Sequence, residues 1–272
     1  MKFAVTATPF LAGKVPLLFQ GHLSYAFAQA EKLACDGIEL HLRKPADIDR
    51  EKIRHQCHQH HLEIPAIGTG WAAIADGLTF SNPDPQVSRE AVKRIQEHIE
   101  LAAYLGSSVI IGLILGNLGK QGPQRSARRK IMLDCLRECC QSAQDWGVNL
   151  FLEPVNRYES DHLNTLDDAL KLIKETGFPN LKLLADTFHM NLEEVDPASS
   201  IRKAKPAHIH LADSNRQAPG HGHTDFGRII QSLSDIGYTG YLSFEMLPLP
   251  GPEQAAKDGL QWIRKILSEF QV

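Results

Sequence analysis

Residues 181–191 read LKLLADTFHMN, an apolar run that ends in Asp186 and is followed three residues later by His189. The turn-forming sequence GFPN, residues 177–180, precedes it, and an apolar run of this length is typical of a buried strand. A carboxylate and an imidazole at the end of a buried strand cost desolvation free energy unless a partner compensates them. A divalent metal or a bound substrate is one such partner. In the alternative interpretation, Asp186 caps the next helix and His189 packs beside it.

Strands of this kind recur along the whole chain. We expect eight of them, at Phe3–Thr8, Gly37–Leu42, Glu63–Gly68, Ser108–Leu113, Asn149–Pro154, Leu181–Thr187, Ala207–Asp213 and Tyr241–Met246. Apolar residues at helical spacing lie between them, and the clearest helices are Val87–Leu105, Arg129–Trp146, Thr165–Glu175 and Pro252–Phe270. Eight strand–helix alternations without a linker predict a parallel (β/α)₈ TIM barrel that forms a single domain over residues 1–272.

The composition excludes several classes of partner. Hydrophobic residues make up 43% of the chain, charged residues 22%, and the net charge is −3. This balance, without a basic stripe, argues against nucleic acid and against a membrane surface, and no apolar run of about 18 residues is present to span a bilayer. The first residues, MKFAVT, lack the features of a signal peptide. Five cysteines without a Cys-x-x-Cys motif are expected to be reduced thiols in a cytoplasmic protein.

Polar residues stand near the ends of the last four predicted strands. Glu153 is followed by Asp186 after 33 residues, by His210 after a further 24, and by Glu245 after a further 35. Each gap is about one strand–helix unit, so the four side chains are expected at one end of the barrel. Three carboxylates and one imidazole repel unless a cation joins them, and this donor set suits Mn²⁺, with Mg²⁺ or Co²⁺ as alternatives. The competing interpretation is four unrelated buried polar residues.

The motifs around these residues resemble a known family. The sequences EPVNRYE (153–159), DTFHMN (186–191) and HIH (208–210), with Asn215-Arg216 and Pro219-Gly220, are similar to the D-tagatose/D-psicose (ketose) 3-epimerase branch of the xylose isomerase-like TIM barrels. The resemblance implies that Glu153, Asp186, His210 and Glu245 bind the metal and that Glu153 and Glu245 are the catalytic acid/base pair. It also implies substrate contacts from Glu159, His189 and Arg216, and a homo-oligomer, either a dimer or a tetramer.

The expected reaction is inversion of the carbon next to a ketone (C3) of a ketose or keto sugar acid. A base removes the C3 proton, an enediolate forms, and a second group returns a proton to the opposite face. An aldose–ketose or hydroxypyruvate-type isomerase would use the same metal and bases and stays an alternative. A zinc-dependent endonuclease is rejected because the third and fourth strands contain no His. A sensor barrel would be expected to have lost a metal ligand or a base, whereas this chain keeps the four expected ligands and both glutamates.

Other polar clusters have less specific interpretations. The chain departs from the resembled family at Ala212-Asp213-Ser214 and in the His-rich segment that follows. In that segment, His221, His223 and Asp225 are expected to contact substrate or a second metal. The alternative is that Asp225 packs the loop. Glu39 and His41 share one face of the second strand and are expected to have a structural or supporting role. The segment HQCHQHH, 55–61, is interpreted as a solvated helix face. Of the two long loops, Thr69–Gln86 with Trp71 is placed to cover the pocket, and the Gly-rich Gly116–Arg125 lacks a phosphate-loop pattern.

Overall fold

The computed structural model describes residues 1–270 and contains a closed barrel of parallel strands. The sheet order is β2-β1-β3-β4-β5-β6-β7-β8-β9, and pairing of β1 with β9 closes the ring. The barrel strands are β1 (Lys2–Thr8), β3 (Gly37–His41), β4 (Ala66–Gly68), β5 (Ser108–Ile111), β6 (Leu150–Leu152), β7 (Leu181–Asp186), β8 (His208–Leu211) and β9 (Tyr241–Phe244). The predicted (β/α)₈ barrel and all eight predicted strands are therefore confirmed.

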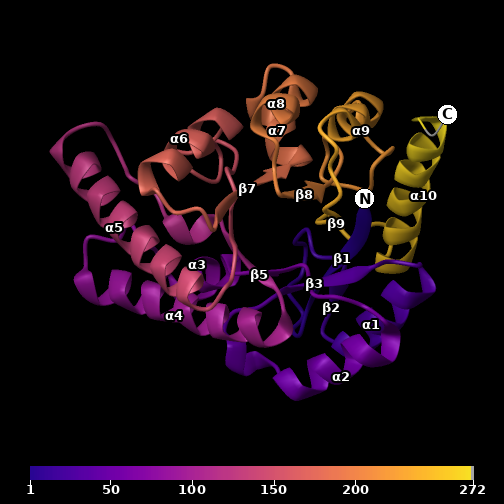
Figure 1. Ribbon diagram of the computed structural model, residues 1–272, viewed down its shortest axis with the longest axis horizontal. Coiled ribbons are helices and arrows are strands. Elements are labelled where there is room, and N and C mark those ends of the chain that lie inside the picture. The colour runs from indigo at the N-terminus through magenta and orange to yellow at the C-terminus, as the bar shows by residue number, and fades with distance from the viewer. Residues whose placement is uncertain (271–272) are drawn as a thin grey trace.

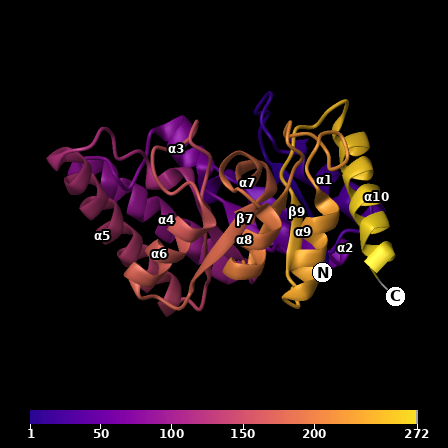
Figure 2. The same cartoon turned by 90° about the horizontal axis from the view of Figure 1, so that it is seen from above.

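Helices surround the strands as a ring (Figure 1). They are α1 (Leu23–Lys32), α2 (Arg50–His60), α3 (Gly70–Asp76), α4 (Pro85–Leu105), α5 (Pro123–Asp145), α6 (Leu166–Thr176), α7 (Thr187–Glu193), α8 (Pro197–Ala204), α9 (Phe226–Asp235) and α10 (Pro252–Phe270), with the short 3₁₀ turns η1 (Pro45–Asp47) and η2 (Leu113–Leu115). Figures 1 and 2 both place the N-terminus between α9 and α10, where the chain closes the barrel.

Local sequence explains where several helices begin and end. The Asp84 side chain accepts a hydrogen bond from the Gln86 N–H ahead of α4, and Gly106 ends that helix in the left-handed conformation. Thr165 caps α6, since its Oγ1 accepts the Asp168 N–H at 3.2 Å. These caps satisfy backbone groups that the first and last turns of a helix leave unpaired.

Side-chain alternation along the strands separates two apolar regions. The large core lies between strands and helices, and a second, small cluster consists of Ala66, Ile110, Phe151 and Leu184. Each of these four residues lies two positions before a residue at the barrel mouth, so it faces the same way, into the barrel. This apolar cluster fills part of the interior below the residues at the mouth.

The structure differs from the sequence-based expectation in three places. The segment Thr69–Gln86 contains α3 rather than being an open loop, and α5 begins at Pro123, six residues before the predicted start at Arg129. A two-residue strand, β2 (Phe19–Gln20), was not predicted and pairs in parallel with the end of β1. In Figure 2 the indigo segment after β1 projects at the same edge of the barrel as α3.

Within residues 1–270, no helix is both long and apolar enough to cross a bilayer.

Candidate active site

Four polar side chains from adjacent strands converge at the mouth of the barrel. Asp186 is the last residue of β7, His210 lies in β8, and Glu153 and Glu245 directly follow β6 and β9. One ligand atom from each of these residues lies within 4.8 Å of the others, and all four residues are buried. The structure thus brings together the set that strand spacing predicted.

His210 is the centre of this group. Its Nδ1 lies 3.4 Å from Glu153 Oε1 and 3.5 Å from Glu245 Oε2. Among the described residues, neither His210 Nδ1 nor Asp186 Oδ2 has a hydrogen-bond partner, although both atoms are buried. Buried polar atoms without partners are costly, and three carboxylates around one imidazole supply the oxygen and nitrogen donors of a divalent-metal site. The residues present therefore fit a metal ion.

The carboxylic acids of the site differ in proton affinity. Burial raises the pKa of Asp186 to about 8, and the nearby charge of Glu245 adds to this shift. Burial also raises the pKa of Glu153. Burial alone would raise the pKa of Glu245 too, but the charges of His210, His41 and Arg216 outweigh it and hold that pKa at about 2. The environments of Glu153 and Glu245 thus shift the pKa values of these two carboxyl groups in opposite directions.

Arg216 reaches the same mouth from the loop after β8. Its Nη1 donates to Glu159 Oε1 at 3.0 Å and its Nη2 to Glu245 Oε2 at 3.4 Å, while its guanidinium carbon lies 4.6 Å from the centre of the Phe188 ring. The Nε of Arg216 is buried without a partner among the described residues. A guanidinium held on two sides with a free N–H can receive an oxygen-rich ligand.

His189 is oriented by Asn156, a residue that the sequence analysis did not single out. The Asn156 backbone N–H donates to His189 Nδ1 at 3.2 Å, and the Asn156 amide lies 2.8 Å from the same atom and 3.0 Å from Glu159 Oε1. Because Nδ1 is an acceptor, the proton of the neutral ring is on Nε2, which lies 3.6 Å from Asp186 Oδ2. Burial and the charge of Arg216 lower the pKa of His189 to about 3. His189 is therefore a neutral N–H donor at the mouth.

A cavity of about 150 Å³ opens above these residues. It is lined by the polar residues Glu153, Glu245, His189 and Arg216 and by apolar residues that include Trp71. Trp71 packs edge-on against Phe10, with ring centres 5.0 Å apart. The predicted cover of the pocket by the segment that begins at Thr69 is thus confirmed, in the form of helix α3.

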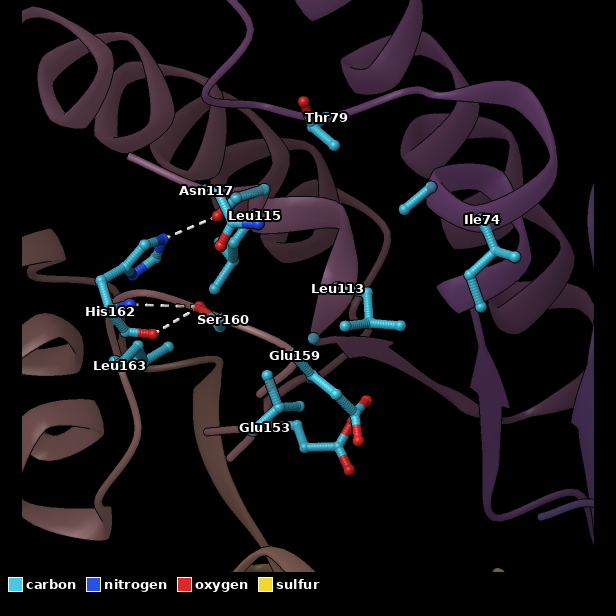
Figure 3. Close-up of a pocket in the computed structure, with 14 residues that line it drawn as sticks. Ile74, Thr79, Leu113, Leu115, Asn117, Glu153, Glu159, Ser160, His162 and Leu163 are labelled. Carbon is cyan, nitrogen blue, oxygen red and sulfur yellow. Dashed lines mark hydrogen bonds between the residues drawn. The ribbon is translucent and has the colours of Figure 1, made fainter. Parts of the chain in front are cut away.

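A second cavity of about 220 Å³ continues from the first (Figure 3). Figure 3 shows Glu153 and Glu159 at one end of it and Thr79 at the other. Near Thr79, the His162 Nε2 lies 2.8 Å from the Gly116 carbonyl oxygen. The two cavities share Glu153 and Glu159, so the carboxylates border both.

The loop that departs from the resembled family is organised by Asp213. Its carboxylate accepts the backbone N–H groups of Ser214, Gly220 and Thr224 at 2.7, 2.8 and 3.0 Å. The interpretation that Asp225 packs this loop is corrected, since Asp225 instead caps α9 by accepting the Arg228 N–H. A short polar loop needs one buried acceptor for its inward-facing N–H groups, and Asp213 is the buried one.

The two histidines of the loop lie away from the residues of the mouth. His223 Nδ1 lies 3.0 Å from Ser214 Oγ, and His221 Nε2 lies 3.4 Å from an oxygen of Asp258 on α10. Neither belongs to a potential metal-binding group within residues 1–270. The histidine segment 55–61 is largely exposed on and just after α2, as expected for a solvated helix face, and the five cysteines are free.

The sequence matches the model of a known family over residues 27–266, described as xylose isomerase-like TIM barrel. The chain belongs to this family. Among curated relatives of this xylose isomerase-like barrel, an L-ribulose 3-epimerase of Mesorhizobium japonicum is 34% identical over 83% of this chain and 76% of its own length. A ketose 3-epimerase of Arthrobacter globiformis is 30% identical over 84% and 81%. The resemblance to ketose 3-epimerases that the motifs indicated is confirmed.

Solved structures give the same relationship. A structure described as L-ribulose 3-epimerase superposes on this xylose isomerase-like barrel with a TM-score of 0.85 at 28% identity, and covers 98% of this chain and 95% of its own. One further curated relative differs in its named reaction: a 3-dehydro-D-guloside 4-epimerase of Escherichia coli is 33% identical over 64% of this chain and 70% of its own length.

Proposed function

We propose that this protein is a metal-dependent epimerase that inverts C3 of a ketose or keto sugar acid. The observation that carries the proposal is the convergence of Glu153 and Glu245 at one mouth, where they lie 3.4 and 3.5 Å from His210 Nδ1. Their environments also shift their pKa values in opposite directions. Paired carboxyl groups whose environments separate their pKa values are a recurring sign of acid and base roles. The named activities of the 3-epimerase relatives support the same reaction.

The chemistry requires two groups on opposite faces of the substrate carbon. One glutamate takes the C3 proton, and the electron pair of the broken C–H bond moves toward the C2 carbonyl, which gives an enediolate. The other glutamate then delivers a proton to the opposite face of C3, so the carbon is inverted and the enzyme has exchanged the protonation states of its two carboxyl groups. A later proton exchange with solvent restores them.

Glu153, Asp186, His210 and Glu245 would hold the metal, for which Mn²⁺ is our first choice and Mg²⁺ or Co²⁺ are alternatives. When bound, this cation supplies Lewis-acid stabilisation of negative charge on the substrate oxygens. A carboxylate has two oxygens, so Glu153 and Glu245 can contact the cation through one and serve as base through the other.

Three further residues would orient the sugar. The free Nε–H of Arg216 and the Nε2–H of His189 are buried donors, suited to substrate hydroxyl or carbonyl oxygens. Glu159 contacts Arg216 directly and is linked to His189 through the amide of Asn156. Its carboxylate can accept a hydrogen bond from a substrate hydroxyl. We further predict a homo-oligomer, a dimer or a tetramer, as the ketose epimerase resemblance implies.

The test is a substrate panel followed by proton NMR. Mn²⁺-loaded protein is incubated with ketoses, ketose phosphates and keto sugar acids, and spectra are recorded after the metal is chelated. We expect one class to yield its C3 epimer. Formation of an aldose instead would indicate a carbonyl-moving isomerase on the same site, and absence of any conversion across the panel would contradict the proposal.

A further inference from the structure

A buried carboxylate lies directly behind the mouth of the barrel and does not belong to the proposed metal-ligand set. Glu39, on β3, is 0% exposed, yet three imidazoles surround its carboxylate. Its Oε1 lies 2.8 Å from His41 Nε2 and 3.0 Å from His210 Nε2, and its Oε2 lies 2.7 Å from His208 Nε2. A buried carboxylate needs such partners, since an unpaired charge in the barrel interior would be unfavourable.

The strand geometry explains how the four residues meet. Glu39 and His41 are two positions apart on β3, and His208 and His210 are two positions apart on β8, so each pair points to the same side of its strand. Both pairs face the barrel interior. His208 also stacks on Phe151 of the interior apolar cluster, with ring centres 5.1 Å apart. The contacts on both sides therefore hold the Glu39 carboxylate in one position.

The decisive contact is the one with His210. The two nitrogens of this imidazole lie near different carboxylates. Nε2 lies 3.0 Å from Glu39 Oε1, close enough for an ion pair although the two groups are not aligned as a hydrogen bond, and Nδ1 lies 3.4 and 3.5 Å from Glu153 and Glu245. An ionised carboxylate is an acceptor only, so it favours the tautomer that carries the proton on Nε2. In that tautomer the Nδ1 lone pair is directed at the proposed metal position.

We propose that Glu39 is a positioning residue of the metal site, which fixes the tautomer and ring orientation of His210 so that Nδ1 is the ligand atom. His41 and His208 in turn anchor Glu39. The inference rests on the proposed function, because it assigns a role relative to the metal proposed there. Histidine ligands in metal sites commonly donate their second N–H to a carboxylate, and loss of that partner costs about 10- to 100-fold in metal affinity or activity.

Glu39, His208 and His210 also lie close enough to hold a cation themselves. A metal there would need the Nε2 lone pair of His210, which would leave the proton on Nδ1 and remove that atom from the carboxylate site. The two arrangements are therefore mutually exclusive for a neutral His210. Metal stoichiometry and the tautomer of His210 distinguish between them.

The experiment compares wild type with Glu39→Gln, which keeps the size of the side chain but removes its charge. Mn²⁺ binding is measured by isothermal titration calorimetry, and folding of the metal-free proteins by circular dichroism and urea unfolding. We expect one Mn²⁺ per wild-type chain and a dissociation constant about 10- to 100-fold higher in the variant. Glu39→Asp, which keeps the charge but shortens the side chain, is expected to lie between them. It is the second variant should the Gln protein not fold.

The tautomer is read separately from the imidazole nitrogens. Long-range ¹H–¹⁵N correlation spectra of the Mg²⁺-loaded protein, labelled in His, are expected to place the His210 proton on Nε2. Glu63→Gln is the matched control, because Glu63 is also acidic but its side chain is 62% exposed and pairs with Lys2 outside the barrel. The control should bind Mn²⁺ as wild type does.

Four results would overturn the inference. A proton on Nδ1 of His210 would show that Nδ1 is not the ligand atom. Two metals per chain, with the second lost in Glu39→Gln, would show that the cluster itself binds a cation. A folded Glu39→Gln protein with wild-type Mn²⁺ affinity would overturn the positioning role alone and leave the proposed function standing. A wild-type protein that binds no divalent metal would overturn both proposals.

Discussion

The guanidinium of Arg216 lies 3.4 Å from Glu245, the carboxylate whose pKa is held at about 2, and so couples a proposed substrate contact to a proposed base. Arg216 is held in place by its own backbone as well, which adopts the left-handed conformation with φ of 62°. Its N–H donates to the Asp213 carbonyl at 2.7 Å, and its carbonyl accepts the Leu247 N–H at 2.8 Å. The loop from Asp213 thus delivers one side chain to the mouth in a fixed orientation.

Arg216→Lys is predicted to lower kcat/KM about 10- to 100-fold while the protein still folds. Lysine keeps the charge but cannot contact Glu159 and Glu245 in one plane or stack on Phe188. Steady-state kinetics on the substrate found in the panel measure the effect. Arg157→Lys is the matched control, because Arg157 pairs with Glu193 at the surface with its side chain 61% exposed. Equal kinetics for the two variants would contradict the role of Arg216.

Mn²⁺ affinity is predicted to rise with pH between pH 6 and 8. Burial raises the pKa of Asp186 to about 8, so at pH 6 to 7 the metal-free protein holds a proton there that the metal must displace. The charges of Glu39 and Glu245, which outweigh burial, also raise the pKa of His210 well above its usual value. Metal binding is therefore expected to displace a second proton, from His210. Calorimetry in buffers of different ionisation enthalpy should detect a release of about one to two protons at pH 7.

Asp186→Asn provides the comparison for this pH dependence. The amide cannot be ionised, so metal binding should be weaker and its dependence on pH shallower than in wild type. An affinity for wild type that stays constant between pH 6 and 8 would contradict the assignment of Asp186 as a proton-carrying ligand.

Gly68→Ala is predicted to disturb the mouth through His41. A Cβ at Gly68 would lie 2.4 Å from His41 Nδ1, and the ring would have to move away from Glu39. Overpacking of this kind costs about 1–3 kcal/mol, so we expect a lower Tm together with weaker Mn²⁺ binding. Gly70→Ala is the control, since its Cβ would meet only Leu113 at 3.7 Å. A lower Tm with unchanged Mn²⁺ binding would mean that the His41 position does not matter to the site.

Strand spacing was sufficient to predict the barrel and the four residues at its mouth. The reason is that a barrel brings the ends of successive strands together, so Glu153, Asp186, His210 and Glu245 meet whatever the connecting helices do. Side-chain alternation along a strand predicted that Glu39 and His41 share one face. His208 is related to His210 by the same alternation, and this signal was present in the sequence but was not used.

The features that were missed depend on contacts between distant segments. Nothing local distinguishes Asn156 from its polar neighbours, and its role follows only from where α7 places His189. Helix α3 is seven residues long, too short for a helical pattern to be read from the sequence, and it packs against η2. Asp213, rather than Asp225, organises the His-rich loop because only Asp213 is buried beneath its N–H groups.

The most direct test of the central claim follows the C3 proton in D₂O for Glu153→Gln and Glu245→Gln at saturating Mn²⁺. If the two glutamates act on opposite faces of C3, neither variant will interconvert the epimers. Any remaining deuterium exchange will then be confined to one epimer in Glu153→Gln and to the other epimer in Glu245→Gln. Interconversion that persists in either metal-loaded variant, or exchange of the same epimer in both, would contradict the two-glutamate account.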